Sequence, residues 1–209
     1  MSENKKENNK TKKPVESKLS LDTKAFNEFV KEFREESDRA AVILGVAKLD
    51  LLLYQILIKI LFPNTSSNDD LFDGDAPLST FSAKIHLCHR MGVIDSELTR
   101  ALDLIRKIRN SFAHEVTGCD LDSGSHKDRV KELIAPFEIY DGFERMKKIG
   151  FSSQSSYSVY FRTALAVIVL RLEGIFNIVE PWYEEPFTLI PEHWLETKSS
   201  ESSKKDDKS

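Results

Sequence analysis

Residues 95–114 read DSELTRALDLIRKIRNSFAH, and this stretch decides the fold class. Its apolar residues recur three and four positions apart, at Leu98, Ala101, Leu102, Ile105, Ile108 and Phe112. Because an α-helix turns through about 100° per residue, that spacing gathers them on one helical face. Asp95 precedes the pattern and is a favoured N-cap residue. The stretch therefore predicts an amphipathic helix over 96–113.

The same helical period recurs along most of the chain. It predicts further helices over 23–36, 40–62, 80–91, 126–134 and 157–179. Their expected boundaries are N-caps at Asp22, at Ser37 or Asp38, and at Ser79, with stops at Pro63, Gly92 and Pro181. We expect residues 137–154 to be mostly loop and residues 184–196, EEPFTLIPEHWLE, to form an extended strap on the helices. Since no alternating strand pattern stands out, the prediction is an all-α, single-domain helical bundle.

The two ends of the chain differ from the middle in composition. Residues 1–20 and 197–209 are rich in Lys, Ser, Asn and Glu and poor in apolar residues, which predicts disordered tails around a folded domain at 21–196. The whole chain carries a net charge of −4 while both tails are positive, so the predicted domain is acidic. An acidic domain disfavours direct binding to duplex DNA.

The predicted location follows from the cysteines and the most apolar stretches. The chain has two isolated cysteines, Cys88 and Cys119, which we expect to be reduced thiols. The first residues lack the apolar segment of a signal peptide. The most apolar run, 40–62, contains Lys48, Asp50 and Lys59 and is unsuited to spanning a membrane. We therefore expect a cytoplasmic protein with no membrane contact.

Two clusters invite comparison with metal sites. The acidic run 69–75, DDLFDGD, lacks the ligand spacing of an EF-hand, so we interpret it as a turn before the Ser79 cap. His86 and His89 share a helical face near Cys88, but no fourth ligand is evident. We predict neither a metal site nor a cofactor.

Two residues near the end of the helix 96–113, Arg109 and His114, have side chains that can take part in catalysis. The helical angle places Arg109 inside the apolar stripe, where a buried charge needs a partner. Asp50, at the edge of the stripe in 40–62, is the candidate partner; alternatively it pairs with Lys48 or Arg90, or contacts solvent. Arg109 and His114 would lie about 140° apart on an intact helix. They converge only if the helix ends near residue 113 or if two copies meet across a dimer axis.

Together these side chains suit metal-independent RNA cleavage. Histidine titrates near neutral pH and can move a proton, while arginine holds a phosphate with fixed donors. Asn110 could orient either group. The alternative is structural: His114 interacts with the helix dipole and Arg109 forms a buried ion pair.

The helix 157–179 is apolar on more than one side, which favours a core helix that also serves a dimer interface.

Three stretches resemble the mannitol operon repressor (MltR-like) family. They are EESDRAAVILGVAKLD at 35–50, LFDGDAPLSTFSAKIHLCHRMGVID at 71–95 and LIRKIRNSFAHE at 104–115. The resemblance covers roughly residues 36 to 116 and implies an all-helical regulator of gene expression without a DNA-binding motif of its own. It also implies a structural role for the loop at 69–75.

RNSFAH at 109–114 also resembles the R-x4-6-H motif of HEPN domains, many of which are metal-independent endoribonucleases built as dimers. The resemblance implies a catalytic role for Arg109, Asn110 and His114, with Asp50 as a supporting acid. Val116 stands where some toxin-type members carry an aromatic residue. The resulting hypothesis is a homodimeric regulator that binds or cleaves RNA. The alternative is a non-catalytic regulator or repressor that contacts a protein partner.

Overall fold

The computed structural model describes residues 23–115, 118–151 and 156–182, and within them the regular secondary structure consists of α-helices joined by loops and turns. The helices are α1 (Thr23–Phe33), α2 (Asp38–Ile60), α3 (Phe81–Arg90), α4 (Ser96–His114), α5 (Gly124–Ile134), α6 (Asp141–Gly150) and α7 (Tyr157–Ile178). No strand forms in these three ranges, which confirms the predicted all-α class. The predicted cap at Asp22, the strap at 184–196 and the tails at 1–20 and 197–209 lie outside the described residues.

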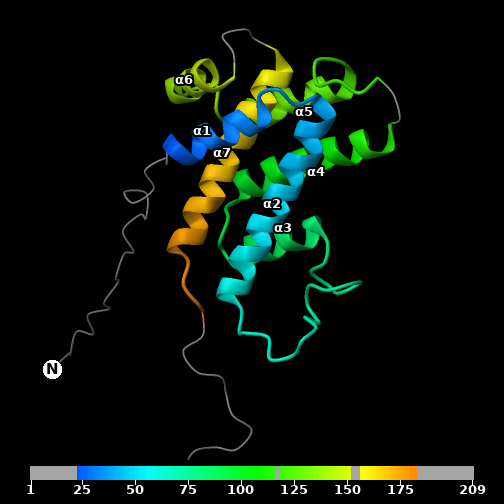
Figure 1. Ribbon diagram of the computed structural model, residues 1–209, viewed down its shortest axis with the longest axis vertical. Coiled ribbons are helices and arrows are strands. Elements are labelled where there is room, and N and C mark those ends of the chain that lie inside the picture. The colour runs from blue at the N-terminus through cyan, green and yellow to red at the C-terminus, as the bar shows by residue number, and fades with distance from the viewer. Residues whose placement is uncertain (1–22, 116–117, 152–155, 183–209) are drawn as a thin grey trace, which may run out of the picture.

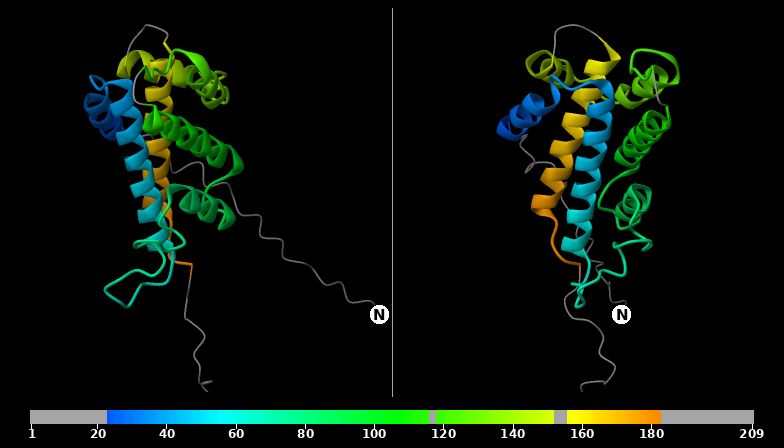
Figure 2. Two further views of the ribbon diagram at one scale, coloured as in Figure 1. Left: turned by 90° about the vertical axis from the view of Figure 1, so that its right-hand side faces the viewer. Right: turned by 45° about the vertical axis from the view of Figure 1, so that its right-hand side comes forward.

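The two longest helices, α2 and α7, lie side by side at the centre of the bundle (Figure 1). On one side α4 packs against α2, with α3 and α5 as its neighbours; on the other, α1 and α6 cover the first half of α7 (Figure 2). α2 is long and apolar enough to cross a membrane by length and composition alone. Its apolar character has a simpler cause, because ten of its residues are buried inside the bundle.

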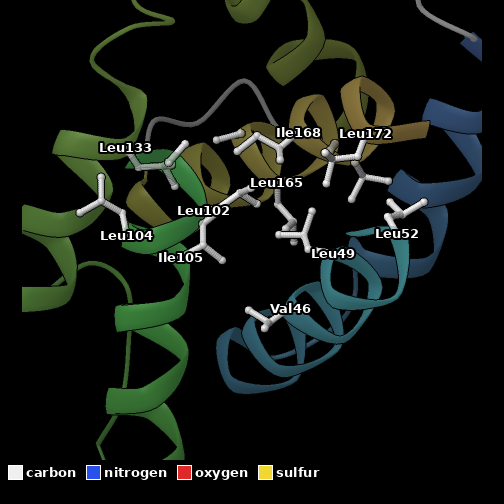
Figure 3. Packing of buried hydrophobic residues seen from close by; sticks show 14 of the residues in the cluster. Val46, Leu49, Leu52, Leu102, Leu104, Ile105, Leu133, Leu165, Ile168 and Leu172 are labelled. Carbon is white, nitrogen blue, oxygen red and sulfur yellow. The ribbon is translucent and has the colours of Figure 1, made fainter. Parts of the chain in front are cut away.

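The core is formed where α2, α4, α5 and α7 meet (Figure 3). Leu49, Leu102, Leu133 and Leu165 are almost completely buried there. Gly45 of α2 lies against α7, and a Cβ atom added to it would be 2.3 Å from Cδ2 of Leu165. The close approach of the two central helices therefore depends on a residue without a side chain.

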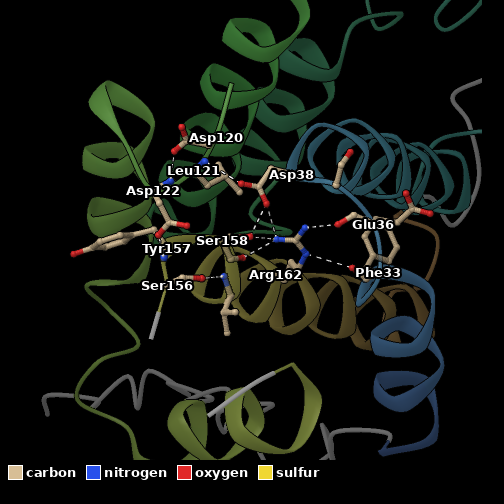
Figure 4. Close-up of polar contacts among 12 residues, drawn as sticks. Phe33, Glu36, Asp38, Asp120, Leu121, Asp122, Ser156, Tyr157, Ser158 and Arg162 are labelled. Carbon is tan, nitrogen blue, oxygen red and sulfur yellow. Dashed lines mark hydrogen bonds and ion pairs between the residues drawn. The ribbon is translucent and has the colours of Figure 1, made fainter. Parts of the chain in front are cut away.

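A buried arginine joins distant parts of the chain (Figure 4). Arg162 of α7 is 6% exposed and pairs with Asp38, at 2.9 Å, while also donating to the carbonyl oxygen of Glu36 at 2.7 Å. Burial raises the pKa of Asp38, but hydrogen bonds from Ser158, the Leu121 amide and Arg162 outweigh it and hold that pKa below its ordinary value of 3.8. The network fixes the link between α1 and α2 against α7.

The helix boundaries follow the expected capping chemistry with two differences. Ser37 caps α2 and Asp95 caps α4, as predicted. Gly92, at φ +70°, ends α3 in the left-handed region, and Val93 N donates to Cys88 O at 2.9 Å. The cap of α3 is Thr80 rather than Ser79, and α1 ends at Phe33, before residue 36.

The prediction that 137–154 is mostly loop is wrong. Residues 141–150 form α6, whose buried side chains include Phe143 and Lys147. The apolar period is hard to see because Lys147 occupies an inward position, where its amino group donates to the Tyr160 hydroxyl at 3.0 Å. A lysine that buries its alkyl chain and pairs its charged end cannot be distinguished from a surface lysine in the sequence alone.

Candidate functional site

The C-terminal half of α4 borders an open groove shared with α2 and the start of α3. The groove encloses about 440 Å³ and is lined by Ile43, Val46, Ala47, Asp50, Thr80, Phe81, Ser82, Arg106, Arg109 and Asn110. Its apolar lining, which we call the floor, consists of Ile43, Val46 and Ala47 of α2 and Phe81 of α3. Arg106, Arg109 and Asn110 form its α4 edge. We call this site the arginine groove.

The structure brings Arg109, Asn110 and Asp50 to this groove but not in the predicted pairing. Arg109 is exposed, and its Nη1 lies 3.3 Å from Oδ1 of Asn110. Asp50 pairs with Lys84 of α3, whose Nζ lies 2.7 Å from the Asp50 carboxylate. The predicted Asp50–Arg109 ion pair is therefore wrong. Lys84 is only 5% exposed, so its buried charge needs that carboxylate more than the solvated Arg109 does.

Arg106 belongs to the same groove, although the sequence analysis gave it no role. Its Nε donates to Oδ1 of Asp103 at 3.0 Å, an i,i+3 pair on α4. With Arg109 it places two guanidinium groups along one edge of an apolar floor. A search for basic residues one helical turn from Arg109 would have found it, because i and i+3 share a face.

His114 does not join the arginine groove. It is exposed, and α4 continues without interruption to this residue. An intact helix keeps Arg109 and His114 on different faces, so one copy of the chain does not bring the two together. The composite RNA-cleaving pair predicted from RNSFAH is therefore not assembled within a single chain.

A second histidine, His126 of α5, contacts the end of α4 instead. Its Nε2 lies 2.9 Å from Oγ of Ser111, and its ring packs against Phe112 with 4.6 Å between centroids. Ser111 in turn donates to Glu115 at 3.0 Å. His126 is 6% exposed, so it works mainly in packing α5 on α4. Sequence reasoning gave it no role, and its only sequence signal is a position near the start of a helix.

Glu115 collects several donors at the C-terminus of α4. The Cys119 thiol lies 3.0 Å from its Oε2, and this hydrogen bond and that from Ser111 lower the pKa of Glu115. The same contact raises the pKa of Cys119. Arg39 donates to the Phe112 carbonyl at 2.7 Å and thereby satisfies one of the free carbonyl groups at the helix end. These contacts form a structural cap.

The two metal-like clusters contain no gathered ligand set. Across the described residues no three His, Cys, Asp or Glu side chains are placed to hold a metal ion. Cys88 is buried, which raises its pKa to about 12, and His89 hydrogen-bonds the Ile94 carbonyl at 3.2 Å. In the acidic loop, Asp69 accepts from the Leu71 amide and Asp73 from the Asp69 amide, both at 2.9 Å, as in a turn.

Comparison with known proteins agrees with the fold. No protein-family model and no curated protein matches the sequence. A solved structure does match: a chain from the X-ray structure of the MtlR–HPr complex from Escherichia coli, with a TM-score of 0.53 and 15% sequence identity. The match covers 72% of this chain and 99% of that chain. At this identity the similarity shows the fold alone, and it supports the MtlR-like architecture that the sequence predicts.

Proposed function

We propose that this protein regulates gene expression by binding another protein, and that the arginine groove is a contact surface for that partner. The observation that carries the proposal is the composition of the groove: two arginines and an asparagine edge an apolar floor, while His114 lies elsewhere. Arginine beside apolar surface is typical of the residues that dominate protein–protein binding energy.

Two further observations favour a protein over a nucleic acid. The chain is acidic overall, so the field around the groove attracts a polyanion less than a basic domain would. The structural neighbour was solved in complex with a protein, HPr. HPr is therefore the first partner to test with the full chain.

The test is calorimetric titration of HPr into the full chain. Arg109→Ala should weaken binding about fivefold or more, because truncation of an arginine that dominates an interface costs over about 1 kcal/mol. Lys107→Ala is the matched control, since Lys107 is an exposed cation on the same helix and does not line the groove. Absence of HPr binding by the unaltered chain, or equal losses in both variants, would refute the proposal.

A second candidate is RNA binding or cleavage at a composite site in a homodimer. The favouring observation is that Arg109 is exposed and free of the Asp50 carboxylate, so a phosphate can reach it. A second copy would have to supply His114. The test is RNA cleavage in EDTA by the full chain and by His114→Ala, together with sedimentation of both. Cleavage that needs both His114 and a dimer would displace the first proposal; a monomer that cuts no RNA would exclude this one.

A further inference from the structure

A second, larger groove lies on another side of the bundle. It encloses about 1130 Å³ between the turn after α3, the start of α4, the end of α5 and the second half of α7. Half-buried apolar side chains line it, among them Leu98, Val167 and Ile175. It shares no lining residue with the arginine groove. We call it the α4–α5–α7 groove.

The rim of this groove carries apolar residues that contact water. Ile139 is 78% exposed, Tyr140 61% and Trp182 73%. Several exposed large apolar residues at one groove are uncommon on a free protein and mark a place that another segment covers. What covers it is indicated by the course of the chain.

The described chain ends at the groove. Trp182 lines it, and the Trp182 amide donates to the Ile60 carbonyl at 3.3 Å, which holds the chain there. The next fourteen residues, 183–196, read YEEPFTLIPEHWLE. They include six large apolar residues: Tyr183, Phe187, Leu189, Ile190, Trp194 and Leu195. The thirteen residues after them, TKSSESSKKDDKS, include none.

The local chemistry of 183–196 favours an extended conformation. Pro186 and Pro191 oppose a continuous helix and remove two backbone donors. An extended chain advances about 3.3 Å per residue, so this segment reaches up to roughly 46 Å. The α7 wall of the groove, from Val167 to Val179, is about 18 Å long at 1.5 Å per residue. The segment is therefore long enough to turn back after Trp182 and follow the groove.

We infer that residues 183–196 of the same chain fill the α4–α5–α7 groove as an intramolecular strap. Tethering favours this occupant, because a short linker holds the segment at millimolar effective concentration beside the groove. The strap buries the apolar rim, so partners must bind elsewhere on the bundle. This inference does not depend on the function proposed for the arginine groove.

The test uses tryptophan fluorescence of the full chain. The protein has two tryptophans, so Trp182→Phe leaves Trp194, within the strap, as the only reporter. We expect blue-shifted Trp194 emission and acrylamide quenching severalfold weaker than in urea. Ile139→Glu and Ile178→Glu, at exposed groove positions, should restore strong quenching and red-shift the emission. Ile149→Glu is the matched control, because Ile149 is 64% exposed on α6 and does not line the groove.

Three results would overturn the inference. Trp194 that is quenched as strongly in the native protein as in urea shows that the strap is not docked. Protection that the two groove variants leave unchanged shows that the segment docks elsewhere. Protection that disappears on dilution, in step with the loss of a dimer in sedimentation, shows that a second copy supplies the segment. Circular dichroism of each variant confirms that the bundle itself is folded.

Discussion

Gly45→Ala tests the packing of the two central helices. The added Cβ would lie 2.3, 3.1 and 3.3 Å from Cδ2, Cδ1 and Cγ of Leu165. Leu165 is fully buried, so its side chain has little room to move away. Overpacking of this kind costs about 1–3 kcal/mol. Replacing a glycine in a helix interior gains about 1 kcal/mol of helix propensity.

In the native background the clash should at least cancel the propensity gain, giving a net loss of up to about 2 kcal/mol in the free energy of unfolding. In a Leu165→Ala background the three clashing atoms are absent. There Gly45→Ala should stabilise the protein by about 1 kcal/mol, because only the propensity gain remains. Leu165→Ala alone should cost about 2–5 kcal/mol through the cavity that it leaves.

The assay is urea denaturation of the four proteins in a double-mutant cycle, followed by circular dichroism. A coupling of about 1–3 kcal/mol between the two positions is expected, which is the size of the clash. If Gly45→Ala changes stability by the same amount in both backgrounds, the helices do not meet through this contact and the reasoning fails.

Three other changes have definite expected outcomes. Arg162→Ala should lower the free energy of unfolding by about 1.5–3 kcal/mol, since it removes the charged hydrogen bonds that this buried guanidinium makes to the half-buried Asp38 carboxylate and to the Glu36 carbonyl. Arg171→Ala, at an exposed position of α7, should cost under about 0.5 kcal/mol. Urea denaturation of the two variants measures both losses, and equal losses would contradict the prediction. The lowered pKa of Asp38 means that its carboxylate stabilises the fold above pH 3.8 and that this contribution is lost as the pH falls below that value, so Asp38→Asn should flatten the acid limb of a stability–pH curve. Glu115→Gln should lower the raised pKa of the Cys119 thiol, because it removes the carboxylate that the thiol contacts. Alkylation of Cys119 by iodoacetamide at pH 8, followed by mass spectrometry, should then be faster. An unchanged rate would argue against the thiol–carboxylate hydrogen bond.

The fold was predictable where the sequence carries both a period and a cap. Ser37, Asp95 and Gly92 mark helix ends by local chemistry that needs no tertiary partner, and each was found in the expected role. α6 was missed because its Lys147 points inward, where the amino group pairs with Glu144 of the same helix and also donates to Tyr160 of α7. The inward position depends on the contact with α7. A one-dimensional pattern does not contain that contact.

The sequence predicted part of the groove lining but not the pairing of its charged residues, and His114, which it grouped with Arg109, lies outside the groove. Arg109, Asn110 and Asp50 do line one groove, but the helical angle alone suggested that Arg109 is buried. An angle gives the face of α4, whereas burial depends on how far α2 and α3 extend along that face. Asp50 pairs with Lys84 because α3 packs against α2 near Asp50, and the position of α3 depends on the packing of the whole bundle. The docking of a partner and the dimer hypothesis stay predictions.

The pairing of α2 with α7 has a consequence for synthesis on the ribosome. α2 is the most apolar of the early helices, yet its principal neighbour begins about a hundred residues later in a chain that emerges from its N-terminus. Until α7 is made, the face of α2 around Gly45 has no native cover, and Arg162 has not yet reached Asp38. The nascent chain therefore leaves the α7-facing side of α2 exposed until residues 157–178 have been made, and we expect this stage of synthesis to be the one most prone to aggregation.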